Sequence, residues 1–117
     1  MGSDSRLSVS ESAEISVVRF NDQKIIDPAA IEELGLELFA LIEKDGRKKI
    51  VLNFQNVEFL SSAALGKLIT FEKKGKKEGS AIILSNIAPE IFQVFSITNL
   101  DKLFKIKDTE ADALAVL

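Results

Sequence analysis

The sequence of 117 residues contains no cysteine, histidine, tryptophan or tyrosine. Without cysteine or histidine, the chain cannot build a Cys/His zinc site, a thiol nucleophile, a redox pair or an imidazole general base. Catalysis could come only from carboxylates, lysine, arginine or an unaided hydroxyl. The lack of cysteine also fits a reducing compartment. We therefore expect a protein that is not an enzyme and that holds no cofactor or metal.

Long apolar runs are absent as well, since no segment approaches the ~20 apolar residues that cross a bilayer. The N-terminal segment lacks the basic-then-apolar order of a signal peptide. The net charge of −3 comes from 18 acidic and 15 basic residues. This balance argues against nucleic-acid binding, which needs a basic face. The sequence predicts a soluble cytoplasmic protein that binds neither membrane nor nucleic acid directly.

The length predicts one domain, and 46% hydrophobic residues can supply its core. Residues 1–12 are rich in serine and poor in apolar side chains. We expect this segment to be a flexible lead-in and residues 13–117 to form the folded domain.

The first half of the domain has two short β-prone runs, residues 15–20 and 24–26, separated by the turn residues Asn21 and Asp22. These runs predict an opening hairpin. Asp27 and Pro28 are typical of a helix start, and apolar residues at helical spacing continue to about residue 44. The apolar run 49–54 then predicts a central strand buried on both faces.

The second half alternates helical and strand patterns. A helix is expected over residues 62–77 with Gly79 at its end, a strand over 81–84, a helix opened by Pro89, a strand over 103–106 and a terminal helix capped by Thr109. The order ββαβαβαβα predicts an α/β domain, because right-handed crossovers between these runs give a mixed, mostly parallel sheet with helices packed on it.

Two hydroxyls, Ser61 and Ser62, lie where the chain leaves the central strand and enters a helix of small residues. In the functional interpretation, one hydroxyl is displayed at a helix N-terminus, where free N–H groups and the helix dipole stabilise an added phosphate. In the structural interpretation, Ser61 or Ser62 only caps the helix, a contribution of about 1 kcal/mol. Spacing alone favours the cap.

Other chemistry finds less support. The sequence has no Gly-x-Ser-x-Gly elbow and no glycine-rich phosphate loop. A cation bound by Asp22, Asp27, Glu58 and Asp101 is an alternative that we do not favour, because scattered carboxylates are normally caps, turns and solvated surface.

From about Ile15 to Leu117 the chain resembles a STAS domain, the family of bacterial anti-sigma factor antagonists and of the cytoplasmic tails of sulfate transporters. The resemblance rests on residues 25–27, 50–54 and 57–66, then on Gly79 with residues 82–84, and on residues 88, 89, 91, 92, 95, 100 and 104–106. It implies that Ser62 takes the position of the phosphorylated serine. Ala63 and Ala64 replace a hydroxyl residue and a glycine of the family, and Ser61 stands where the family has aspartate.

The resemblance further implies a regulator of transcription. An unmodified Ser62 would let the protein sequester an anti-sigma factor, itself a serine kinase of the ATP-binding type, and so release a sigma factor. Phosphorylation of Ser62 would end that binding, and a phosphatase would restore it. The partner surface would comprise Asp22, Asp27, Ser61, Ser62, Ala63 and Ala64. The alternative is a scaffold or sensory STAS module that is never phosphorylated and acts in a larger signalling assembly.

Overall fold

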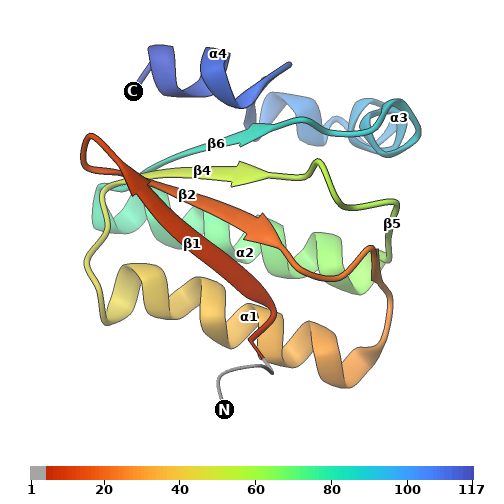
Figure 1. Cartoon of the computed structure of the whole chain (residues 1–117). Coiled ribbons are helices and arrows are strands. Elements are labelled where there is room, and N and C mark those ends of the chain that lie inside the picture. Colours follow the sequence, from red (N-terminus) through yellow and green to blue (C-terminus); the bar gives the residue numbers. More distant parts are fainter. Residues whose placement is uncertain (1–4) are drawn as a thin grey trace.

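The structure is a computed structural model that describes residues 5–117. Five strands form the main sheet in the order β1-β2-β4-β6-β7, and β3 pairs with β5 in a separate small sheet (Figure 1). The strands are β1 (Leu7–Ser12), β2 (Ile15–Phe20), β3 (Lys24–Ile25), β4 (Lys49–Asn53), β5 (Phe59–Leu60), β6 (Ala81–Ser85) and β7 (Lys105–Lys107). Only the β1–β2 pair of the main sheet is antiparallel, which confirms the predicted mixed, mostly parallel sheet.

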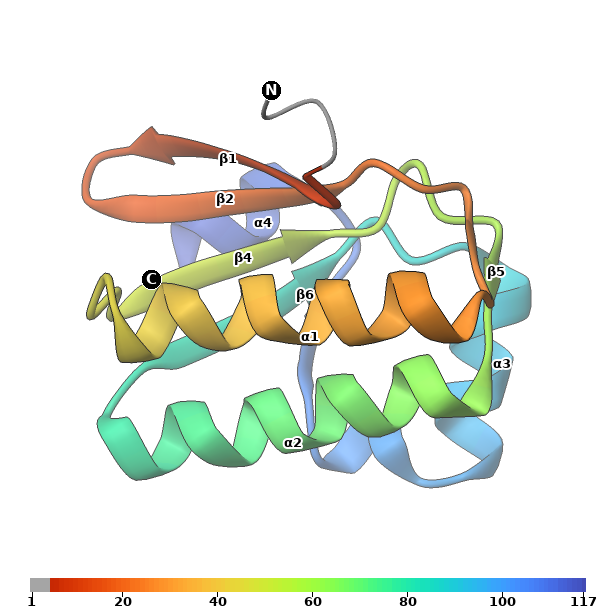
Figure 2. The same ribbon diagram turned by 90° about the horizontal axis from the view of Figure 1, so that it is seen from below.

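Helices cover both faces of the main sheet. Helices α1 (Pro28–Glu43) and α2 (Ser62–Glu78) lie side by side on one face and run in the same direction, as Figure 2 shows. The short helix α4 (Glu110–Ala115) lies on the other face, and α3 (Pro89–Ile97) stands near β5 with the 3-10 helix η1 (Leu100–Lys102) after it. The fold is therefore a three-layer α/β domain, in which two long helices cover one face of the sheet and one short helix covers part of the other.

The central strand β4 shows why its sequence is almost wholly apolar. Ile50 and Leu52 are fully buried against α1 and α2, whereas Val51 is buried on the other face beneath Ala113 of α4. Successive side chains of a strand point to opposite faces, so a strand covered on both sides needs an apolar residue at each position. The prediction of a strand buried on both faces is confirmed.

The opening hairpin differs from the prediction. Leu7–Ser12, assigned to the flexible lead-in, form β1 and pair with β2. Residues 1–4 of that predicted lead-in lie outside the described residues. The β1–β2 turn is made by Ala13 and Glu14, both with positive φ, 51° and 70°. Such a turn usually carries asparagine, aspartate or glycine, so its sequence provides no recognisable signal.

The second predicted hairpin strand also has a different partner. Lys24 and Ile25 form β3, which pairs in parallel with Phe59 and Leu60 of β5 rather than with β2. The predicted pairing of residues 15–20 with residues 24–26 is therefore wrong. Strand β5 was not predicted, because two residues are too few for an alternation pattern to be visible.

Most helix ends match the predictions from their capping residues. The Asp27 carboxylate accepts a 3.0 Å hydrogen bond from Ala30 N, and Gly79 ends α2 with a φ of 79°. Thr109 caps α4 by accepting from Asp112 N at 3.1 Å. The last strand lies at Lys105–Lys107 instead of 103–106, because the N–H groups of Leu103 and Phe104 donate to the Leu100 carbonyl at the end of the 3-10 helix η1. Within residues 5–117, no helix has the length and apolar character needed to span a bilayer.

Candidate functional site

Helices α1 and α2 begin next to each other because the strands that precede them, β3 and β5, pair in the small sheet. Ile25 of β3 pairs with Leu60 of β5, and the next N–H along, that of Ser61, donates a 3.1 Å hydrogen bond to the Ile25 carbonyl. Each strand then leads within two residues into its helix. The positive ends of two helix dipoles consequently face the same edge of the molecule.

Ser61 is the cap of α2. Its backbone is extended, with φ −75° and ψ 165°, and its hydroxyl accepts a 3.2 Å hydrogen bond from Ala64 N. This geometry is that of a helix N-cap. Of the two serines that the sequence left open as caps, Ser61 therefore takes the structural role, and Ser62 is left free of it.

Ser62 is the first residue of α2 and is exposed. Its hydroxyl makes no hydrogen bond within residues 5–117, and the backbone N–H groups of Ser62 and Ala63 are likewise without a partner there. Unpaired N–H groups and the helix dipole favour negative charge at such a position. The site can therefore accommodate an added phosphate.

The two alanines of the predicted partner surface differ in exposure. Ala63 is exposed, but Ala64 is fully buried in the core beneath the start of α2. The prediction that Ala64 contacts a partner is wrong, because its side chain is inaccessible. We call the accessible surface formed by Asp27, Ser61, Ser62 and Ala63 the helix-start surface.

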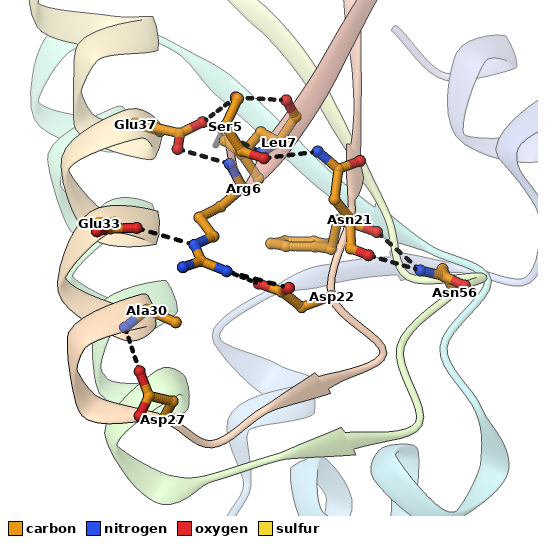
Figure 3. Close-up of polar contacts among 11 residues, drawn as sticks. Ser5, Arg6, Leu7, Asn21, Asp22, Asp27, Ala30, Glu33, Glu37 and Asn56 are labelled. Atoms are coloured by element: carbon orange, nitrogen blue, oxygen red, sulfur yellow. Dashed lines mark hydrogen bonds and ion pairs between the residues drawn. The ribbon is translucent and has the colours of Figure 1, made fainter. Parts of the chain in front are cut away.

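Asp22 belongs to a network that fastens β1 to α1 (Figure 3). Its carboxylate lies 3.3 Å from Arg6 Nη1, and Arg6 Nε donates to Glu33 Oε1 at 3.0 Å. The hydrogen bond to Glu33 and the charge of Asp22 raise the pKa of Arg6 above its usual value. Glu37 completes the network by accepting from Arg6 N at 2.7 Å. Asp22 is therefore paired with Arg6, whereas the exposed Asp27, also drawn in Figure 3, caps α1.

The four carboxylates considered for a cation do not come together. Asp22 is paired with Arg6, and Asp27 caps α1. In the part of the chain that the structure describes, no three acidic side chains lie close enough to hold a metal ion. The arrangement thus gives no support to the alternative of a cation site.

A groove that the sequence did not reveal lies beside the helix-start surface. It has a volume of about 510 Å³ and runs between the segment around β5 and helix α3. Phe59 and Val94 line it and are exposed. A signal for it exists in α3, where Glu90 and Val94 line it at helical spacing on a stripe separate from the buried Phe95.

Comparison with known proteins agrees with this fold. The model of the family described as STAS domain matches residues 6–113. The chain therefore belongs to the STAS domain family. It is 31% identical over 103 residues to a Thermotoga maritima protein named as a candidate anti-sigma factor antagonist, a match that covers 78% of this chain and 91% of the relative.

Solved structures give the same assignment. A crystal structure of an anti-sigma factor antagonist from Mycobacterium paratuberculosis superposes with a TM-score of 0.78 at 28% identity, covering 97% of this chain and 95% of that chain. The unphosphorylated form of the anti-sigma factor antagonist SpoIIAA has a TM-score of 0.70 at 21% identity, covering 93% and 94%, and at that identity it shows the shared fold. The chain is thus a member of the anti-sigma factor antagonist group of STAS proteins.

Proposed function

We propose that this protein is a cytoplasmic, phosphorylation-controlled switch that binds an anti-sigma factor kinase. With Ser62 unmodified, it sequesters the kinase and frees a sigma factor for transcription. Transfer of a phosphate from ATP to the Ser62 hydroxyl ends the binding, and a phosphatase restores it. The protein carries out no catalysis of its own, since the kinase and the phosphatase perform both reactions.

The observation that carries the proposal is the separation of roles between the two serines. The Ser61 hydroxyl is engaged by Ala64 N, whereas the adjacent Ser62 hydroxyl is exposed and unbonded within residues 5–117. A kinase can therefore reach Ser62 without breaking the cap of α2. The hydroxyl also lies on a rigid helix start, which fixes its position for a partner.

Phosphorylation at this position changes the surface without unfolding it. A phosphoserine carries about two negative charges near neutral pH. The free N–H groups at the start of α2 stabilise this charge within the isolated protein. In a complex, however, the same charge is costly, because an interface shaped for a hydroxyl must desolvate it.

The proposal departs from the family pattern at one residue. Ser61 stands where the resemblance places aspartate, so the carboxylate beside the phosphoacceptor is missing. Serine and aspartate cap helices about equally well, and the start of α2 is preserved. The exchange therefore leaves the presentation of Ser62 intact and changes only the charge that a kinase meets.

Intact-mass measurement after incubation with the cognate kinase and ATP tests the proposal. We expect the wild-type protein to gain one phosphate and Ser62→Ala to gain none. Ser96→Ala, at an exposed serine of α3, serves as the matched control and gains one phosphate. In binding measurements, Ser62→Ala should hold the kinase permanently, and Ser62→Asp should not bind it. Equal binding by these two variants, or an unmodified protein that sediments as a large assembly, would favour the scaffold alternative.

A further inference from the structure

The groove between β5 and α3 has an apolar base and partly exposed apolar sides. Val57, Leu65 and Ile91 line it and are at most 8% exposed, so they form its base. Phe59 is 56% exposed and Val94 41% exposed, and they form its sides. Its volume of about 510 Å³ is large enough for several side chains of a partner, since pockets for whole small ligands span about 300–1,000 Å³.

The charge of the groove has one sign. Glu58 and Glu90 line it, and no lysine or arginine does. Neither carboxylate forms an ion pair anywhere in residues 5–117, although eight ion pairs are found there. Lys24 reaches the same edge, but its Nζ lies 5.6 Å from the ring centre of Phe59 and pairs with neither carboxylate. The groove thus combines an apolar interior with unneutralised negative charge.

The groove is continuous with the helix-start surface. Leu60 lines it and directly precedes Ser61, while Leu65 lines it from the first turns of α2. A protein that covers Ser62 therefore also covers one end of the groove. Leaving Phe59 and Val94 uncovered beside such an interface would forgo the apolar burial that usually anchors a complex.

We propose that this groove receives a segment of the partner protein that reads Ser62, and that the segment carries a large apolar side chain next to lysine or arginine. The inference rests on the proposed function and names a second contact of the same partner. The apolar side chain packs on Phe59 and Val94, and the cation pairs with Glu58 and Glu90. Because the groove and Ser62 are separate contacts, the groove contributes affinity that does not depend on the state of Ser62.

Binding of the cognate kinase to matched variants tests the contact. Phe59→Ala should weaken the affinity of the kinase by more than tenfold, because large aromatic anchors dominate interfaces. Phe92→Ala is the control, since Phe92 is 40% exposed on α3 but does not line the groove, and it should bind as the wild type does. The pair Glu58→Gln and Glu90→Gln should weaken binding about tenfold and reduce its salt dependence. Glu78→Gln, an exposed glutamate at the far end of α2, should leave both unchanged.

The outcomes separate this inference from the proposed function. If Ser62→Asp abolishes kinase binding while Phe59→Ala and the double glutamine variant bind like the wild type, the groove contact is refuted and the switch stands. Dimers of this chain that Phe59→Ala disrupts would overturn the proposed occupant in favour of a second copy. Unchanged folding of each variant is verified by its thermal unfolding.

A titration that needs no kinase tests the groove even if the wild-type protein does not bind the kinase. The probe is the peptide acetyl-Lys-Leu-Phe-Lys-amide, followed through the methyl NMR signals of Leu60, Ile91 and Val94. We expect these signals to shift with the lysine peptide and to shift at least tenfold more weakly with its glutamate counterpart. If neither peptide shifts them, or both do so equally, the groove has no preference for basic apolar segments and the inference is wrong, whatever the wild-type protein does with the kinase.

Discussion

The backbone N–H of Ser61 donates a 3.1 Å hydrogen bond to the carbonyl oxygen of Ile25. This bond continues the β3–β5 pairing by one residue and links the chain just before α2 to the chain just before α1. Asp27 and Ser62 each lie within two residues of it. Their relative position is therefore set by the paired backbone rather than by two independent loops.

The cap of α2 gives the first prediction. Ser61→Ala should lower the free energy of unfolding by about 1 kcal/mol, because Ala64 N loses its acceptor at the helix start. Ser61→Asp should retain the stability of the wild type, since aspartate caps as well as serine and suits the helix dipole. Urea unfolding measures both. A larger loss in Ser62→Ala than in Ser61→Ala would contradict the assignment of the cap.

The second prediction concerns the strand that the sequence did not indicate. Leu7 is 6% exposed in β1, and Leu7→Ala should cost about 2–5 kcal/mol, as for other buried leucines. Val9 is two residues further along and 41% exposed, so Val9→Ala should change stability by no more than about 0.5 kcal/mol. Thermal unfolding distinguishes the two. Equal, small effects would show that β1 adds little to the fold.

Where the prediction from sequence succeeded, the signal was local. Asp27 with Pro28, Gly79, and Thr109 mark helix ends through contacts made within a few residues, and all three are found in these roles. The apolar run of β4 was equally clear, because burial on both faces leaves a continuous pattern.

The failures share a cause, which is that partners distant in sequence decide the outcome. Strands β3 and β5 have two residues each and exist because they pair with each other. The burial of Ala64 likewise depends on the hydrophobic core against which α2 packs. The groove exists because α3 lies beside β5. The β3–β5 pairing and the burial of Ala64 leave no periodic pattern in the chain, and the groove leaves one only on its α3 side.

The exposed position of Ser62 could be expected only in part. Two adjacent serines before a helix leave open which of them caps it, since either can place its oxygen near a free N–H. The structure separates them through the register of β5, which brings Ser61 N to the Ile25 carbonyl and starts α2 one residue later. The resemblance to a family predicted Ser62 as the phosphorylated residue. The hydrogen bonds explain why Ser61, and not Ser62, caps the helix.

The attachment of α4 gives the third prediction. Glu110 Oε1 accepts from Asn53 Nδ2 at 2.8 Å and from Arg19 Nη2 at 2.6 Å, so that one carboxylate ties α4 to two strands. Glu110→Ala should cost about 1–3 kcal/mol, because Asn53 is 2% exposed and its amide loses its acceptor. It should also speed hydrogen exchange in α4. Asp112→Ala is the matched control in the same helix turn, because its exposed side chain makes no such contact within residues 5–117. An equal loss of stability in Asp112→Ala would contradict the role of Glu110.

The last prediction concerns a buried carboxylate on α2. The side chain of Glu72 is 7% exposed, its Oε1 has no hydrogen-bond partner within residues 5–117, and Oε2 lies 3.8 Å from Lys76 Nζ. Burial raises the pKa of Glu72 above its usual value of 4.5, and the charge of Lys76 only partly opposes this shift. The folded protein consequently holds the Glu72 proton at a pH where the unfolded chain has already released it.

This difference makes stability fall as pH rises. The slope of the free energy of unfolding with pH follows the protons bound by the unfolded state minus those bound by the folded state, which is negative for Glu72. The loss is absent below the unfolded pKa and complete above the folded one. Glu72→Gln removes the titration, so its stability relative to the wild type should increase between about pH 4 and pH 7. Urea unfolding at both values measures the change, with Glu78→Gln as an exposed control on the same helix. A relative stability that is constant or decreases with pH would mean that burial does not disfavour the Glu72 charge.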